Sequence, residues 1–166
     1  MEESPYLAKR EHLIERYGYL PLLGCGSPDY LERLLAISRL RKFQAGEVIA
    51  IEGEYDHWTY ILLDGEVSIL KENQELARLE TPGDTFGEQV LIDLEPRSAT
   101  VEAVSESLCL AIDGALVSRM ERSERDSFNA IFFHLLAETL SARLRTSNEK
   151  ILQLQQALEA SRATPS

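Results

Sequence analysis

Cysteine and histidine are scarce in this chain, and its positive charge is outweighed. Cys25 and Cys109 have no paired spacing, and His12, His57 and His134 are too scattered to suggest a metal site. Lysine and arginine total 17 against 28 aspartates and glutamates, giving a net charge of −11. A polyanion such as DNA would be repelled by that balance. These shortages argue against a metal centre and against a DNA-binding protein.

Long apolar runs are also missing. No stretch near the N-terminus has the length of a signal peptide or a membrane span, so we expect a cytoplasmic protein without membrane association. The 166 residues are 44% hydrophobic and 27% charged, which suits one folded domain with an appendage. Neither a nucleophile with a base nor a pair of carboxylates at a recognisable spacing can be assembled. We therefore expect no enzymatic activity.

The pattern of residues changes along the chain and divides it into four segments. These are a helical segment 1–37, a β-rich segment 38–122, a long helix 123–160 and a disordered tail 161–166. Within the first segment a helix is predicted to begin at Ser27-Pro28, because serine caps free N–H groups and proline loses nothing at the first helical position.

The β-rich segment alternates short strand-like runs with glycine-bearing turns, which predicts a sandwich or barrel. Strands are predicted over Glu47–Ile51, Trp58–Leu63, Glu66–Lys71, Glu75–Glu80, Ser98–Val104 and Ser107–Ile112. Asp64-Gly65 is predicted as a type I′ hairpin turn, which requires positive φ at both central residues. Cys109 lies between two leucines in a strand, so we expect a buried and unreactive thiol.

The long helix carries two apolar stripes. One follows the four-and-three spacing of a coiled-coil seam through Phe133, Ala137, Leu140, Leu144, Ser147, Ile151, Leu154 and Leu158. The other is expected to pack on the β-rich segment through Phe128, Ile131, Phe132, Leu135 and Leu136. Because the seam outruns any plausible barrel, we predict a homodimer through Leu140, Leu144, Ser147, Ile151, Leu154 and Leu158. The alternative is a single amphipathic helix that covers its own domain.

Residues 81–101 combine the parts of an anion site. Gly87 permits a tight turn into a short helix whose first N–H groups are unpaired and can hold a phosphate. Arg97 brings a planar fork of donors, and Pro96 stiffens its approach. Glu88 would repel a phosphate but accepts well from sugar hydroxyls. Phosphate, sugar hydroxyl and apolar walls together describe a nucleotide.

The order Phe86-Gly87-Glu88, a short apolar run and Pro-Arg-Ser-Ala-Thr-Val resembles the phosphate-binding cassette of cyclic-nucleotide-binding domains. The resemblance covers about residues 38–112. It implies a mainly β fold, a jelly-roll-like double-stranded β-helix with flanking helices. It also implies a ligand site for cyclic AMP or cyclic GMP made by Phe86, Gly87, Glu88, Gln89, Val90, Arg97, Ser98 and Ala99.

The family assigns roles within this cassette. Its arginine binds the cyclic phosphate, its glutamate takes the ribose 2′-hydroxyl, and its glycine and short helix donate main-chain N–H groups. These roles fall on Arg97, Glu88 and Gly87, and Ser98 occupies a position that contacts the phosphate or a guanine amino group. Val90 departs from the family's usual small residue and narrows the space for a ligand. Gln89 replaces an apolar residue.

Residues 143–150 of the long helix are similar to the segment of catabolite-activator proteins in which two small polar residues bond the adenine across the dimer. Ser147 and Asn148 fall on those two positions. A base lying there would explain why a polar residue interrupts the apolar seam. Alternatively, Ser147 only sets the register of a coiled coil.

We therefore expect a cyclic-nucleotide sensor that signals through its long helix to a partner protein. The eight residues after Leu158 leave no room for a helix-turn-helix reader of the kind that follows this helix in catabolite-activator proteins. An unpaired guanidinium inside the pocket would be costly, which makes Arg97 an argument for ligand binding. The alternative is a structural dimerisation module whose β-roll no longer binds nucleotide. The choice between cyclic AMP and cyclic GMP stays open.

Overall fold

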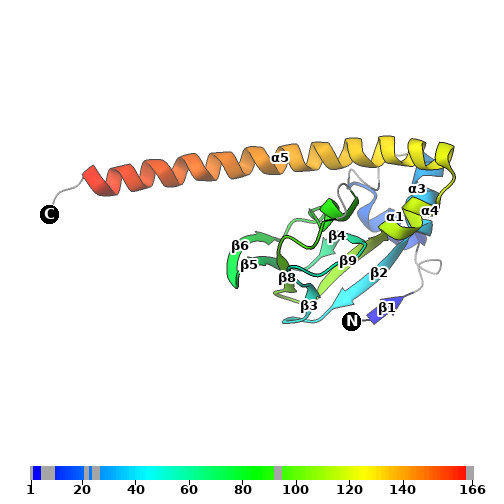
Figure 1. The fold of residues 1–166 in the computed structure, drawn as a ribbon, viewed down its shortest axis with the longest axis horizontal. Coiled ribbons are helices and arrows are strands. Elements are labelled where there is room, and N and C mark those ends of the chain that lie inside the picture. Colours follow the sequence, from blue (N-terminus) through cyan, green and yellow to red (C-terminus); the bar gives the residue numbers. More distant parts are fainter. Residues whose placement is uncertain (1, 5–9, 21–22, 24–26, 92–94, 164–166) are drawn as a thin grey trace.

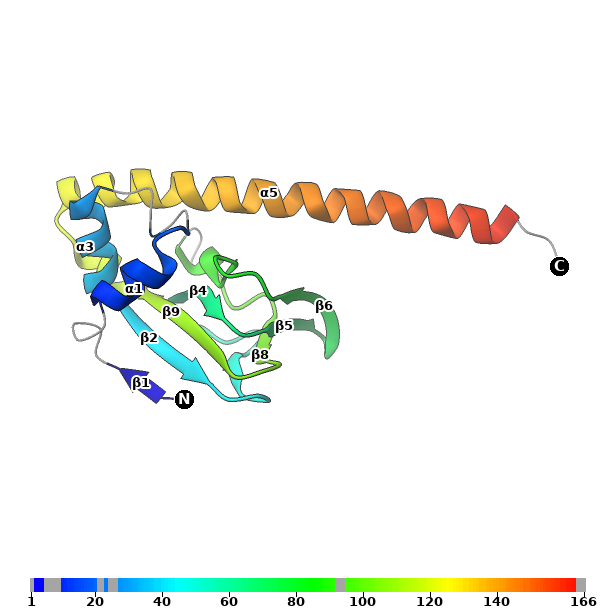
Figure 2. The ribbon, with the colours of Figure 1, turned by 180° about the vertical axis from the view of Figure 1, so that it is seen from behind.

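The computed structural model describes residues 2–4, 10–20, 23, 27–91 and 95–163. Two antiparallel sheets form a β-roll, short helices cover one end of it, and one long helix runs past the roll and beyond it (Figures 1 and 2). This mainly β fold with flanking helices confirms the expected fold class. Among the described residues, no helix has both the length and the apolar character needed to cross a membrane.

Each sheet joins strands that are distant in sequence. The first has the order β1-β2-β9-β4-β7, with strands Glu2–Ser4, Ser38–Phe43, Ser107–Asp113, Trp58–Asp64 and Thr85–Phe86. The second has the order β3-β8-β5-β6, with strands Val48–Ala50, Thr100–Ala103, Val67–Lys71 and Gln74–Leu79. All pairings are antiparallel.

Strands β4 and β9 are buried on both faces and divide the interior into two cores. Successive side chains of a strand point to opposite faces. On β4, Tyr60 and Leu62 therefore pack inside the roll, whereas Ile61 and Leu63 pack toward the helices. The roll core is small, and one of its walls is the cassette residue Phe86, whose ring stacks on Tyr60 at 5.0 Å between centroids.

Two predicted features of the β-segment are corrected by the structure. Asp64-Gly65 does not close a hairpin, because β4 and β5 belong to different sheets, and only Gly65 of the pair has positive φ. The two-residue hairpin joins β5 to β6 through Glu72 and Asn73, with φ of 50° and 62°. Gly65 is required for another reason: a Cβ there would lie 2.5 Å from the Glu106 carbonyl oxygen.

The N-terminal segment holds a strand as well as the expected helices. Helices α1 and α3 span Arg10–Tyr17 and Pro28–Ala36, and the Ser27 hydroxyl caps α3 by accepting from the Tyr30 N–H at 3.2 Å. However, β1 lies within the segment 1–37, which was expected to be helical, and it pairs with β2. Strand β2 and the two-residue β7 were not among the predicted strands.

A short helix α4, Gly114–Arg119, leads into α5, Arg122–Ala163. The predicted tail is wrong for residues 161–163, which continue α5, and residues 164–166 lie outside the described residues. The stripe expected to pack on the domain does so: Phe128, Phe132, Leu135 and Leu136 are buried in the core beneath the helices, and Ile131 is partly buried against it. The later seam residues are open, with Leu144 61% and Leu154 70% exposed.

Cys109 is fully buried in the roll core, as expected. Burial raises the pKa of its thiol from 9.0 to about 12. A folded-state pKa above the unfolded value means that the buried thiol stabilises the fold fully below about pH 9 and less as pH rises toward 12.

We predict that Cys109 reacts with thiol reagents only when the protein unfolds. In a Cys25→Ser variant, which leaves a single thiol, labelling at pH 8 should be at least about 100-fold slower in buffer than in 8 M urea, because only the exposed thiolate is nucleophilic. Spectrophotometric labelling rates provide the measurement. Equal rates in the two conditions would contradict the burial of this thiol.

Candidate functional site

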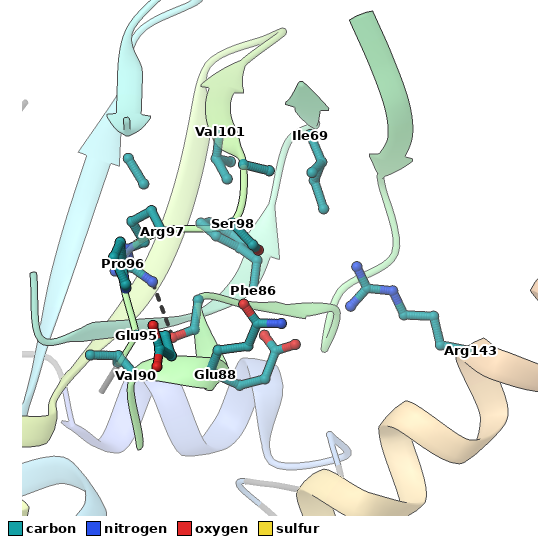
Figure 3. A pocket seen from close by; sticks show the side chains of 14 residues that line it. Ile69, Phe86, Glu88, Val90, Glu95, Pro96, Arg97, Ser98, Val101 and Arg143 are labelled. Atoms are coloured by element: carbon teal, nitrogen blue, oxygen red, sulfur yellow. Dashed lines mark hydrogen bonds between the residues drawn. The ribbon is translucent and has the colours of Figure 1, made fainter. Parts of the chain in front are cut away.

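A cavity of about 180 Å³ opens between the two sheets beside β7 (Figure 3). Its lining residues are Ala50, Ile69, Phe86, Gly87, Glu88, Gln89, Val90, Glu95, Pro96, Arg97, Ser98, Ala99, Val101 and Arg143. All eight cassette residues singled out from the sequence are among them. The walls combine apolar side chains from the sheets with a turn of main chain and several charged groups.

The turn that enters the cavity depends on Gly87. Its φ of 75° lies in the left-handed region, and a Cβ at this position would overlap the Arg97 Nη1 atom and lie 2.9 Å from the Trp58 carbonyl oxygen. A single 3₁₀ turn follows over Glu88–Leu91. In this turn Gln89 faces solvent, whereas Val90 is buried and narrows the cavity.

The Arg97 guanidinium is buried and fully engaged inside the protein. Its Nε donates to Asp56 Oδ2 at 2.8 Å and its Nη1 to the Gly87 carbonyl at 3.1 Å, while Nη2 donates to Asp56 Oδ1 and to the Trp58 carbonyl. These bonds occupy four of its five N–H groups. The argument that this guanidinium would be unpaired without a ligand is therefore wrong.

The backbone around this ion pair is held as firmly as the side chains. The Arg97 N–H donates to the Glu54 carbonyl at 2.9 Å, and the Gly53 N–H donates to the Arg97 carbonyl at 2.8 Å. Asp56 Oδ1 also accepts from the Trp58 N–H at 2.8 Å. Residue 97 thus has a fixed position relative to the loop between β3 and β4.

Arg143 is a cavity residue absent from the set of sites predicted from the sequence. It reaches the cavity from α5, across from Arg97 (Figure 3), and its Nη1 donates to the Thr85 carbonyl at 2.8 Å. The signal was present, because Arg143 opens the helical segment whose similarity drew attention to Ser147. The similarity of that segment points to base contacts at Ser147 and Asn148 and assigns no role to Arg143.

The two predicted base-contact residues do not line this cavity. Ser147 borders a second cavity of about 530 Å³ between α5 and the segment from β6 to β7, whereas Asn148 borders neither. Both side chains are exposed. Arg143 borders both cavities, so the second space adjoins the first along the helix.

Charged groups of both signs surround the cavity. Glu88 and Glu95 face Arg97 and Arg143, and Asp56 lies directly on the Arg97 guanidinium. The described residues contain no group of three or more His, Cys, Asp or Glu side chains placed to hold a metal ion. The charged side chains, the main chain of the Gly87 turn and the apolar walls are together suited to recognising a small polar ligand.

The comparison with known families covers the same residues. The model of the cyclic nucleotide-binding domain matches residues 40–123, which is half of the chain. The chain belongs to the cyclic nucleotide-binding domain family. The match includes the whole turn around Gly87 and extends to the beginning of α5.

Part of the chain is similar in sequence to two proteins of the protein kinase systems. A cGMP-dependent protein kinase of Eimeria tenella is 37% identical over 81 residues, covering 49% of this chain and 8% of the kinase. A cAMP-dependent protein kinase regulatory subunit of Hypocrea atroviridis is 31% identical over 106 residues, covering 63% of this chain and 22% of that subunit. The chain thus spans less than a quarter of the length of either relative.

A solved structure agrees in fold over most of the chain. The cyclic nucleotide-binding domain from Methylobacillus flagellatus superposes with a TM-score of 0.75 at 22% identity, covering 92% of this chain and 88% of that one. At this identity the likeness shows the fold alone. It includes the arrangement of a β-roll with flanking helices.

We predict that Gly87→Ala destabilises the domain by about 3 kcal/mol, because alanine is strained in the left-handed backbone of this position and its Cβ would displace the buried guanidinium. Gly53→Ala is the matched control: Gly53 has φ of 81°, and a Cβ there meets no atom within 4 Å. It should cost only about 1 kcal/mol. Urea unfolding measures both, and equal losses would rule out the steric role of Gly87.

Proposed function

We propose that this domain binds cyclic AMP or cyclic GMP in the cavity beside β7 and passes the signal through α5 to a partner protein. The observation that supports this best is the composition of the cavity. A buried guanidinium, a glycine turn and a carboxylate lie together in a space with apolar walls. That combination suits the phosphate, the ribose and the purine of one small ligand.

Each polar group has a part in this proposal. Arg97 and the turn at Gly87 hold the cyclic phosphate, and the first N–H groups of the 3₁₀ turn add donors that lack partners within the helix. Glu88, which is half-buried on the cavity wall, accepts from a ribose hydroxyl. Phe86, Gln89, Val90, Ser98 and Ala99 complete the contact surface.

The purine extends toward α5. Arg143 joins the phosphate cavity to the second cavity, and Ser147 borders that second space one helical turn further along. A base lying there would bring donors and acceptors of the helix into the site. Asn148, on the neighbouring position, would reach the base from a second copy of the chain.

The open seam of α5 supports a homodimer. Leu144, Ile151, Leu154 and Leu158 are each more than half exposed, on a part of the helix that extends past the roll (Figure 1). Covering such a stripe with the same stripe of a second chain removes this apolar surface from water. Leu140 and Ser147 complete the proposed contact.

Ligand binding is coupled to the position of α5 if the ligand binds more tightly when the helix is in one position than in another. A ligand shifts an equilibrium only through its different affinity for the two states. The bond from Arg143 to the Thr85 carbonyl ties α5 to the strand that leads into Gly87. A nucleotide that contacts both the turn and the helix therefore acts on the attachment of the helix, which a partner protein can sense.

One observation favours a second candidate, a structural dimerisation module. Because Asp56 and two carbonyl groups already satisfy the Arg97 side chain, the cavity is stable without an anion. A domain of this kind would keep its fold and its dimer and would show no affinity for cyclic nucleotides. Titration with the two nucleotides separates the candidates.

We predict that calorimetric titration detects binding of at least one cyclic nucleotide, and that Arg97→Lys weakens it about 10- to 100-fold, because lysine keeps the charge but loses the planar fork. Arg119→Ala, which removes an exposed positive charge away from the cavity, is the control and should bind as the unmodified protein does. Absence of binding by the unmodified protein would favour the structural module. Unchanged binding by Arg97→Lys would refute the role of the fork.

A second test concerns the seam. Light scattering should show a dimer of the unmodified chain and a monomer for the double variant Leu144→Lys and Ile151→Lys, because paired lysines would repel at the centre of the interface. The matched control places the same two charges off the seam, at Leu152 and Gln156, which are both exposed. This control should remain a dimer. If both double variants dimerise, the interface lies elsewhere.

A further inference from the structure

The side chain of Asp56 holds the Arg97 guanidinium in an ion pair through Nε and Nη2. We propose that Asp56 competes with the phosphate of the ligand for the Arg97 guanidinium and thereby sets the affinity of the cavity. This inference rests on the proposed function and names a residue that regulates it. Asp56 lies in the loop between β3 and β4, outside the cassette, and does not itself line the cavity.

The competition follows from a count of donors. A guanidinium has five N–H groups, and a phosphate is held best by two of them in parallel. In the structure Asp56 takes one such parallel pair, from Nε and Nη2, and the Trp58 and Gly87 carbonyls take two more donors. A single N–H on Nη1 is left for a ligand. A bidentate grip on a phosphate therefore requires that Asp56 or one of the two carbonyl groups give up a bond.

The same contact removes charge as well as donors. The carboxylate of Asp56 forms an ion pair with the guanidinium, so the net charge that the pair presents to an incoming anion is close to zero. Glu88 and Glu95 add negative charge on the cavity wall. A monoanionic phosphate therefore gains little from Arg97 while the ion pair is intact.

Arg97 and Asp56 differ in how costly it is for each side chain to leave the ion pair. The side chain of Arg97 is 8% exposed, whereas that of Asp56 is 27% exposed, and its neighbours Tyr55 and His57 in the loop face water. A carboxylate near solvent regains hydration when it turns away, but a buried guanidinium that lost its partner would be left unsatisfied. Release of Asp56 in exchange for phosphate is thus the less costly direction.

Asp56→Asn tests the competition directly, because asparagine keeps an oxygen for the Trp58 N–H and loses the charge. Calorimetric affinity for cyclic AMP and cyclic GMP should increase about tenfold, the equivalent of one recovered charge-assisted hydrogen bond. Glu54→Gln removes a charge from the same loop without touching the guanidinium, and should change the affinity less than about twofold because an exposed charge is screened. Asp56→Glu restores the carboxylate and should return the affinity toward that of the unmodified protein.

The outcomes separate the two proposals. Tighter binding by Asp56→Asn, with Glu54→Gln unchanged, supports the competition, including the case in which only the variant binds measurably. Equal or weaker binding by Asp56→Asn, in a protein that binds before substitution, overturns the competition and leaves the proposed function intact. Absence of binding by both overturns both. Should Asp56→Asn fail to fold by circular dichroism, Asp56→Ser, which also keeps a short acceptor, is judged by the same criteria.

Discussion

The ion pair between the buried Arg97 guanidinium and the half-buried Asp56 carboxylate is the constraint on which the site depends. A guanidinium within the protein requires partners for its charge and its N–H groups, and here the partners come from three separate places: a loop carboxylate, the first residue of β4 and the glycine turn. Meeting that requirement draws the three places together. The cavity exists because these segments converge on one side chain, and the same convergence explains why the turn tolerates no Cβ.

The cassette residues of the cavity could be predicted from the sequence, but the residues that contact them from other elements could not. The cassette residues were recognisable because a glycine turn, a carboxylate and an arginine lie within a short stretch, and all eight line one space. Asp56 and Arg143 were missed since they come from a loop 41 residues before Arg97 and from a helix far beyond it. Nothing in the local sequence marks Asp56, because only the packing of the roll places a carboxylate on this arginine. Arg143 lies in the helical segment whose similarity to catabolite-activator proteins pointed to Ser147 and Asn148, but only the structure places it on the cavity wall.

In the fold, too, features set by neighbouring residues were predictable, whereas features set by contacts between distant residues were not. Most strands were predictable from short β-rich runs between glycine-bearing turns, and the helix cap at Ser27 from local chemistry. The hairpin was misplaced because Asp-Gly is a strong turn signal, yet the strands on either side of it belong to different sheets. The turn that closes a hairpin uses Glu72 and Asn73, whose left-handed backbone is imposed by the pairing of β5 with β6. Pairing partners are a property of the assembled roll.

Because α5 is attached to the roll at Arg143, a small rotation at this contact displaces the far end of the helix by a larger distance. Some twenty residues of α5 follow this anchor, a length of about 30 Å at the rise of an α-helix. A rotation of only about five degrees around the anchor would displace the far tip by between 2 and 3 Å, as the sine of the angle times that length requires. A sub-ångström shift beside the cavity would thereby be amplified into a movement large enough to change how two side chains pack at the far end of α5.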